Sequence, residues 1–178
     1  ELNNLPCIFV ANEFFDALPI KQFLKIKDKW HERFVKFNNK NKPDFLDVPF
    51  DIKKLEKKIK FKISSKQKFI EFSPLTLEYL KNITNKIRLY KGGILIIDYG
   101  YIDKEMKNTL QAISKHKYTD VLSGFGNSDI TYNLSFNLMG QIIKQSGSFF
   151  QSTTTQKEFL IKLGILKRAE IITKNIPF

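Results

Sequence analysis

Two uninterrupted apolar runs mark the strands around which this chain is organised. The first is Ile8-Phe9-Val10-Ala11, and the second is Ile94-Leu95-Ile96-Ile97, which follows a pair of glycines. The first run reads as a short buried strand, and the second, which has no polar alternation, is typical of a strand that is buried on both faces, as in a parallel sheet. We therefore predict two buried parallel strands and an α/β fold.

Between these runs, shorter patterns predict a hairpin. Residues 22–27 and 30–37 read as two strands joined by a turn at Lys27-Asp28-Lys29. We interpret residues 22–37 as a β-hairpin inserted after the first buried strand. The following segment, 38–44, is polar and interrupted by Pro43, and we expect it to be an exposed loop.

Helical periodicity appears in four segments. Ser73 is a cap with Pro74 at the first helical position, and apolar residues at 77, 80, 83 and 87 continue the period towards Gly92. Residues 51–60 show a similar pattern, and the segments 134–145 and 156–163 are each followed by a glycine. We also expect a short helix or strand within 106–114, an irregular loop at 124–129 and a short strand at 148–152.

The composition is that of one folded domain. Of 178 residues, 42% are hydrophobic and 13% aromatic, which is enough for a single core over residues 1–178. Neither a long apolar run nor a basic-then-apolar start is present, so we expect no membrane span and no secretory signal, and an intracellular protein. Cys7 has no partner for a disulfide, and His31 and His116 lack a second ligand at metal spacing, so we predict no metal site.

The formal charge of +12 raises the question of nucleic acid. The lysines are spread along the chain, and their densest group, within 53–68, is mixed with Glu56 and apolar residues. No basic-aromatic RNA-binding motif is visible. We therefore interpret the lysines as a solvated surface, and nucleic-acid binding rests on nonspecific phosphate attraction alone.

Both predicted parallel strands run directly into carboxylates. Glu13 and Asp16 follow the first strand, and Asp98 and Tyr99 follow the second. Ligands of open α/β sheets bind beyond the carboxyl ends of the strands, so these residues are candidates for one site. Two alternatives stay open. Asn12 or Asp16 could cap the first turn of a helix, with Glu13 as a solvated acid, and Asp98 could close the turn after its strand.

The two strand ends, in their order and spacing, belong to a longer pattern. Further segments continue it over nearly the whole chain: Trp30-His31-Glu32-Arg33-Phe34-Val35, Glu71-Phe72-Ser73-Pro74, Thr109-Leu110-Gln111-Ala112 with His116 and Asp120, Asp129-Ile130-Thr131, Thr155-Gln156-Lys157-Glu158-Phe159-Leu160, Leu163-Gly164-Ile165 and Arg168-Ala169-Glu170. In this pattern the chain resembles the MidA-like family of S-adenosylmethionine-dependent methyltransferases. The mitochondrial member of that family methylates a protein arginine and assists the assembly of respiratory complex I.

The resemblance implies a partial Rossmann-like class I methyltransferase fold, the C-terminal part of such a domain, with S-adenosyl-L-methionine as cofactor. Transfer to arginine requires that a nitrogen is aligned and loses its proton. We predict Glu13 and Asp16 as the catalytic residues that hold the guanidinium in bidentate fashion. The alternative is that they contact the amino group of the cofactor. The predicted substrate-binding residues are Asn12, Asp98, Tyr99, Trp30 and Arg33.

The chain also departs from the family pattern. Asn133 and Ser135 stand where the family has a histidine and an acid. No glycine-rich turn after a first strand and no acid after a second strand is found, although these features bind the cofactor in this class. We expect that the N-terminal half of the family domain is missing, that the C-terminal end is shorter, and that this chain alone binds the cofactor weakly or not at all.

Other functions stay open beside the methyltransferase. The chain could be a noncatalytic remnant that docks a respiratory complex I subunit, and a basic nucleic-acid-binding protein is the least favoured possibility. For Trp30 and Arg33, packing and a cross-strand salt bridge are favoured over contact with a partner protein. The resemblance implies a cytoplasmic location in a bacterium and the mitochondrial matrix in a eukaryote.

Overall fold

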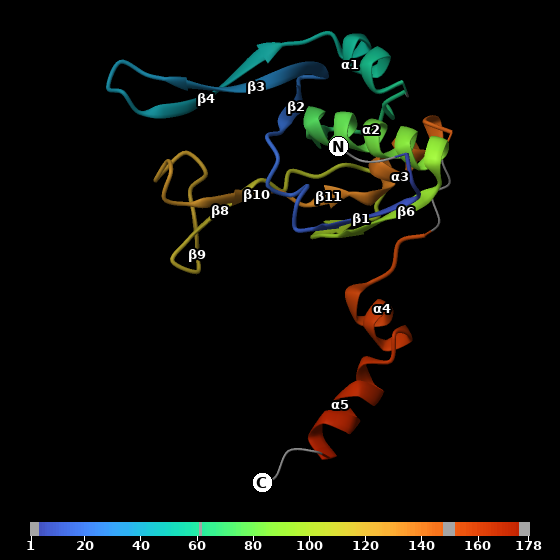
Figure 1. Cartoon of the computed structure of the whole chain (residues 1–178). Coiled ribbons are helices and arrows are strands. Elements are labelled where there is room, and N and C mark those ends of the chain that lie inside the picture. Colours follow the sequence, from blue (N-terminus) through green and yellow to red (C-terminus); the bar gives the residue numbers. More distant parts are fainter. Residues whose placement is uncertain (1–3, 61, 148–151, 175–178) are drawn as a thin grey trace.

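The parallel pair predicted from the two apolar runs is present. The computed structural model describes residues 4–60, 62–147 and 152–174. In it, β1 (Cys7–Asn12) pairs in parallel with β6 (Gly92–Ile97), from Cys7 opposite Gly92 to Asn12 opposite Ile97 (Figure 1). At the start of β6 a glycine is required, because Gly92 has a φ of +119° and an added Cβ would lie 1.9 Å from the Cys7 carbonyl oxygen. Because β1 and β6 are parallel and pair along their whole length, their carboxyl ends lie at the same edge of the sheet.

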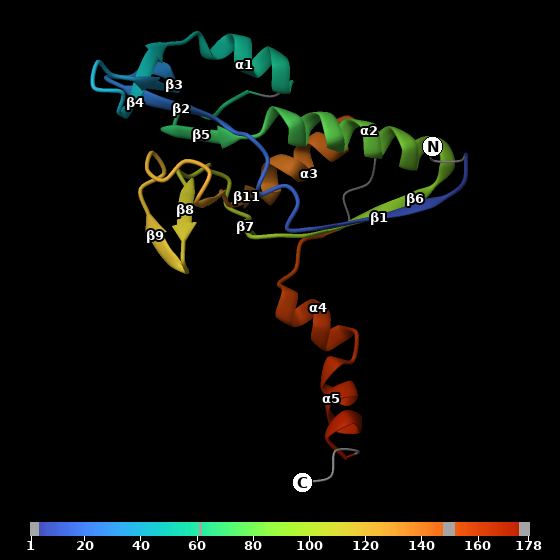
Figure 2. The ribbon, with the colours of Figure 1, turned by 60° about the vertical axis from the view of Figure 1, so that its left-hand side comes forward.

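Two helices cover one face of this pair, as Figure 2 shows. Helix α2 (Pro74–Tyr90) begins at the predicted cap, Ser73, and α3 (Phe136–Gln145) begins after Ser135 and packs against α2. On the other face, Ile8 and Val10 are 82% and 66% exposed. Within the described part of the chain, β1 is therefore covered on one face only, and the prediction that β6 is buried on both faces is wrong, because its residues are exposed or half-buried. Alternate side chains of β1 point away from the helices, and no described element buries them.

The predicted hairpin is confirmed as part of a four-stranded antiparallel sheet. Strands β2 (Lys21–Ile26) and β3 (Lys29–Phe37) form the hairpin, and β4 (Pro43–Pro49) and β5 (Phe69–Phe72) extend it in the order β4-β3-β2-β5. The sequence did not predict β4 or β5. The loop expected over 38–44 is shorter, because its last two residues already pair with β3.

Helix α1 (Ile52–Ile59) covers this second sheet and confirms the helix predicted at 51–60. Asp51 caps it by accepting a hydrogen bond from the backbone N–H of Lys53. Leu55 and Ile59 are buried in a cluster with apolar side chains of β2 and β5. The lysines of α1 face solvent, which agrees with the interpretation of a solvated basic surface.

Short strands surround the carboxyl end of β6. β7 (Gly100–Tyr101) pairs in parallel with β11 (Leu134–Ser135), and β8 (Gln111–Ser114) lies between β9 (Lys117–Thr119) and β10 (Asp129–Thr131). The segment 106–114 thus contains a strand. The irregular loop expected at 124–129 is present but ends one residue earlier, where β10 begins. The helix predicted at 134–145 begins after β11.

Helices α4 (Gln156–Lys162) and α5 (Ile165–Lys174) form an arm that extends away from the sheets (Figures 1 and 2). A capping box of Thr155 and Glu158 starts α4, which confirms the helix predicted at 156–163, whereas α5 was not predicted. Neither helix contains a buried residue. Of the strand predicted at 148–152, residues 148–151 lie outside the described residues, and Ser152 is in no strand.

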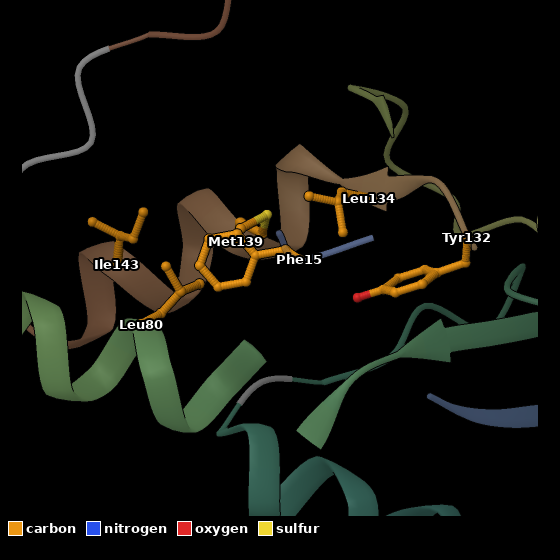
Figure 3. Close-up of a cluster of buried hydrophobic side chains, with 6 residues drawn as sticks. All are labelled: Phe15, Leu80, Tyr132, Leu134, Met139 and Ile143. Atoms are coloured by element: carbon orange, nitrogen blue, oxygen red, sulfur yellow. The ribbon is translucent and has the colours of Figure 1, made fainter. Parts of the chain in front are cut away.

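The first core cluster joins the turn after β1 to the helices. Figure 3 shows its members, which are Phe15, Leu80, Tyr132, Leu134, Met139 and Ile143. Phe15 is fully buried there, and it immediately precedes Asp16. The core therefore anchors the turn that carries the candidate acids.

Candidate functional site

The turn after β1 separates its two candidate acids. The backbone N–H of Glu13 donates to the Ile97 carbonyl at 2.9 Å, which continues the parallel ladder by one residue. Glu13 has a φ of +44°, so the chain turns sharply there, and its side chain and that of Asn12 are exposed. No helix begins between β1 and β2. The alternative in which Asn12 or Asp16 caps a helix is therefore wrong.

Asp98 lies at the same edge, as predicted, but its carboxylate is already engaged. Oδ2 accepts hydrogen bonds from the backbone N–H groups of Phe15 and Asp16, at 3.1 and 3.3 Å, and Oδ1 accepts one from Tyr99 at 2.9 Å. Asp98 therefore fixes the β1 turn against the end of β6, which is the turn-closing alternative. The neighbouring Tyr99 is exposed, and its carbonyl accepts from the N–H of Leu134.

Asp16 is the most unusual carboxylate of the described chain. It is only 5% exposed, and its Oδ1 has no hydrogen-bond partner among the residues that the structure describes. Burial raises the pKa of the Asp16 carboxyl, and the negative charges of Glu13 and Asp129 raise it further. A buried acceptor without a donor is costly and uncommon, so Asp16 stands out among the carboxylates at this edge.

We call Glu13, Asp16, Asp98 and Asp129 the acidic corner, because each of the other three is linked to Asp16 by charge repulsion. Burial, followed by the charge of Asp16, raises the pKa of Asp98. The described residues contain no group of three or more histidine, cysteine or acidic side chains arranged for a metal ion. Carboxylates that repel each other at a strand end are suited to an organic cation.

Tyr132 is hydrogen-bonded to the turn that carries Asp16, and the sequence did not single it out. Its backbone N–H donates to the Asp16 carbonyl at 3.1 Å, and its hydroxyl lies 3.5 Å from Thr76 Oγ1. Burial, and then the nearby charges of Glu71, Asp98 and Asp16, raise the pKa of Tyr132, so its hydroxyl stays protonated at neutral pH. The only signal in the sequence was its place directly after the Asp129-Ile130-Thr131 segment.

Glu71 connects the second sheet to this region. Its Oε2 accepts from Gln22 Nε2 at 2.6 Å, and its Oε1 accepts from the backbone N–H of Thr109 at 3.0 Å. The N–H of Asn133 donates to Thr109 Oγ1 at 2.9 Å, so the residue in the place of the family histidine joins the same network. Burial raises the pKa of the Glu71 carboxyl. Glu71 therefore has a structural task that the sequence did not reveal.

Trp30 and Arg33 lie on β3, in a different sheet from the acidic corner. Trp30 packs against the apolar cluster that α1 forms with β2 and β5, and Lys25 Nζ lies 5.3 Å from the centroid of the Trp30 ring. Arg33 makes a bidentate ion pair with Asp47, at 2.9 and 3.0 Å, and lies over the Phe45 ring. The pair lowers the pKa of Asp47. Packing and a cross-strand salt bridge thus account for both residues, and the structure does not bring them together with Glu13 and Asp16.

The corner does not form a cradle for the predicted cofactor. Residues 12–18 contain no glycine, and three backbone N–H groups at this edge already donate to Asp98. Glycine-rich turns bind nucleotide-like cofactors through free backbone N–H groups. The described residues therefore do not fit S-adenosylmethionine at this edge. A cavity of about 760 Å³ lies along β6, between α2, α3 and the start of α4. Asp98 lines it, whereas Glu13 and Asp16 do not.

Replacement of Asp16 by asparagine is expected to stabilise the fold at pH 7, by on the order of 1 kcal/mol. A carboxyl whose pKa is raised on folding binds more protons in the native state, so wild-type stability falls as the pH rises from the usual value near 3.8 through the raised native value. Asparagine removes this loss. Urea unfolding at pH 4 and pH 7 measures the free energy of unfolding of both proteins. Asp28→Asn, in an exposed turn, is the control. A less stable Asp16→Asn variant at pH 7 would contradict the expected repulsion.

A family model described as an S-adenosyl-L-methionine-dependent methyltransferase matches residues 1–154. The chain is 32% identical over 168 residues to the mitochondrial protein arginine methyltransferase NDUFAF7 of Xenopus tropicalis, covering 94% of this chain and 38% of the relative. It is 26% identical over 177 residues to the human protein of that name, covering 97% and 39%. The chain thus spans less than two fifths of these relatives.

Two crystal structures of proteins from Burkholderia thailandensis share the fold. The first has a TM-score of 0.77 at 20% identity and covers 99% of this chain and 48% of that chain. The second, which is bound to S-adenosyl-homocysteine, has a TM-score of 0.74 at 21% identity and covers 99% and 47%. Both proteins therefore contain the arrangement of sheets and helices described above within a chain about twice as long.

Proposed function

Because this chain belongs to the MidA-like family of S-adenosyl-L-methionine-dependent methyltransferases, we propose that it forms the arginine-binding side of a protein arginine N-methyltransferase. Its predicted class I methyltransferase fold, present in part, is confirmed by the structural relatives. The observation that carries the proposal is the buried, unpaired Oδ1 of Asp16, set among three further carboxylates of the acidic corner.

A guanidinium satisfies this corner better than other cations do. It presents five N–H donors in one plane, so it can donate to Asp16 and to a second carboxylate at once, whereas a lysine ammonium is a compact point charge. Asp16 receives the guanidinium from the protein interior, and the exposed Glu13 closes on it from the solvent side. Asp98 is a positioning residue, because its hydrogen bonds hold the turn that carries both acids.

The raised pKa of Asp16 also suits the chemistry. Methylation of a guanidinium nitrogen releases one proton, and a carboxylate with a higher pKa is a better proton acceptor. S-adenosylmethionine supplies the methyl group in this family. Asp16 would bind the guanidinium, orient its free nitrogen and accept that proton.

Cofactor binding gives the first test of whether this chain supplies the arginine-binding side while another segment binds the cofactor. We expect calorimetric titration with S-adenosylhomocysteine to show weak or no binding by the folded chain alone. Binding should appear when a separately expressed N-terminal segment of a family relative is added, and that mixture should transfer labelled methyl groups to arginine, detected as methylarginine. A low micromolar Kd for the chain alone would show that it holds a complete cofactor site.

A noncatalytic docking remnant is the second candidate. The absence of a cofactor cradle at the acidic corner of the described residues favours it. It predicts no cofactor binding in either titration, although circular dichroism shows a folded chain. Either function is consistent with a protein partner, which we propose to be a respiratory complex I subunit. In a eukaryote we propose the mitochondrial matrix, in line with the named location of the relatives, and in a bacterium the cytoplasm. None of the described helices is long and apolar enough to cross a membrane.

A further inference from the structure

Glu71 is a buried carboxylate whose hydrogen-bond partners all donate to it. The residue is only 3% exposed, and it belongs to none of the ion pairs found among the described residues. Its Oε2 accepts from Gln22 Nε2, and its Oε1 accepts from both the backbone N–H and the hydroxyl of Thr109. Both oxygens are therefore acceptors, which is the arrangement of an ionised carboxylate.

The Thr109 hydroxyl has a single proton, and Glu71 fixes where that proton points. Because the hydroxyl donates to Glu71 Oε1, its lone pairs are left to accept from the backbone N–H of Asn133, at 2.9 Å. The Asn133 carbonyl lies 3.5 Å from the same oxygen, so it is the more distant acceptor. Glu71 thus turns the Thr109 hydroxyl into an acceptor for Asn133.

Residues 132–134 connect this network to the ends of both parallel strands. Their three successive backbone N–H groups donate to three separate parts of the chain: Tyr132 to the Asp16 carbonyl at 3.1 Å, Asn133 to Thr109 Oγ1 at 2.9 Å, and Leu134 to the Tyr99 carbonyl at 2.9 Å. The first of these bonds holds the turn after β1, and the last holds the residue after Asp98. The segment therefore ties the acidic corner to Glu71.

The core and Thr109 hold different parts of this segment. The side chains of Tyr132 and Leu134 belong to the first core cluster (Figure 3), whereas the backbone N–H between them is held by Thr109. Without the hydroxyl, the half-buried N–H of Asn133 loses its acceptor, which is costly enough for the peptide to shift towards another one. The neighbouring N–H donates to Asp16, so such a shift is passed directly to the turn.

The network is anchored on the four-stranded sheet. Glu71 of β5 stands directly opposite Gln22 of β2, and Gln22 Nε2 also donates to Asn108 Oδ1 at 3.1 Å. Residues 108 and 109 themselves lie in no helix or strand. Side chains on strands are held more precisely than side chains on loops, so the sheet gives this loop a fixed position.

We propose that Glu71 and Thr109 are positioning residues of the arginine site, an inference that rests on the proposed function of the acidic corner. They hold residues 132–134, and through them the turn after β1, in the geometry in which Asp16 receives the guanidinium. Both act through the backbone of Asn133 and Tyr132. The second sheet thus contributes to arginine recognition from a distance.

Fluorescence anisotropy with two labelled peptides tests this inference on the chain as it is. One peptide contains a single arginine, and the other has citrulline in its place, so the ratio of their dissociation constants measures the preference for the guanidinium. Thr109→Val removes the hydroxyl, and Thr109→Ser keeps it. Thr84→Val is the matched control, because the buried Thr84 hydroxyl donates to the Leu80 carbonyl within α2, at 2.6 Å. Circular dichroism checks that each variant is folded.

We expect Thr109→Val to lower the preference for arginine about fivefold to tenfold, the effect of one lost hydrogen bond. Thr109→Ser should stay within about twofold of the wild type, and Thr84→Val should keep the full preference although it also loses a buried hydroxyl. In the Asp16→Asn background, Thr109→Val should have almost no further effect, because it acts through Asp16. Glu71→Met should act as Thr109→Val does, and the two together should do no more than either alone.

The variants separate the two ways of failing. If the wild type prefers arginine and Thr109→Val does so equally, Thr109 has only a structural role, and the acidic corner keeps its proposed function. Equal losses in Thr109→Val and Thr109→Ser, or an undiminished effect of Thr109→Val in the Asp16→Asn background, would also overturn the inference. If the wild type shows no preference for arginine, the proposed function fails and this inference fails with it.

Discussion

Asp16→Asn should lower kcat/KM for arginine methylation by about 100-fold or more, equal to about 2.7 kcal/mol of transition-state stabilisation. The measurement uses a preparation that transfers methyl groups, either the chain alone or the chain with a cofactor-binding segment. Asparagine has the shape of the aspartate but neither its charge nor its basicity. It therefore cannot balance the guanidinium or accept its proton.

The same substitution is expected to stabilise the fold, so loss of activity cannot be attributed to unfolding. Glu13→Gln should lower activity less, because Glu13 is exposed and solvent competes for its hydrogen bonds. Asp28→Asn serves as the charge-matched control, and binding of S-adenosylhomocysteine should not change. Full activity of Asp16→Asn would remove Asp16 from the arginine site.

Phe15→Ala should cost about 3–5 kcal/mol of unfolding free energy, the range found for large aromatic residues in cores. The Phe15 side chain is fully buried and packs with Leu80 and the other members of the first core cluster. A loss of this size is a large part of the stability of a typical domain. Urea denaturation monitored by circular dichroism measures it.

Phe14→Ala is the matched control. Phe14 is 42% exposed and makes edge contacts with Phe15 and Tyr79 at 5.1 and 5.4 Å between centroids. Its removal should cost about 1 kcal/mol, because little core volume is lost. Equal effects of the two substitutions would contradict the anchoring of the turn by Phe15.

The two sets of variants test adjacent residues with opposite tasks. Phe15 points into the core, and Asp16 is buried at the acidic corner, so a single turn couples fold stability to the candidate site. The backbone N–H groups of both residues donate to Asp98, which ties this turn to the end of β6. Phe15→Ala is therefore expected to weaken arginine binding as well as stability, whereas Asp16→Asn separates the two.

The limits of sequence prediction are clearest in the second sheet. Its hairpin was predicted because Lys27-Asp28-Lys29 separates two runs that favour strands. β4 was missed because it begins and ends with prolines and carries two aspartates, a composition tolerated only at a sheet edge. β5 has four residues, too few for a period. Both are strands because β2 and β3 offer them hydrogen-bonding partners.

By itself, the sequence determined the parallel strand pair, the capped helices, the family and the presence of acids at two strand ends. These features depend on composition, spacing and short motifs, all of which involve residues that are close together in the sequence. Only the tertiary structure decided what each acid does. The positive φ of Glu13 turns its side chain to solvent, three backbone N–H groups occupy Asp98, and the core holds Asp16 with an unpaired oxygen. Burial and hydrogen bonding arise from residues far apart in the chain, and no local pattern records them.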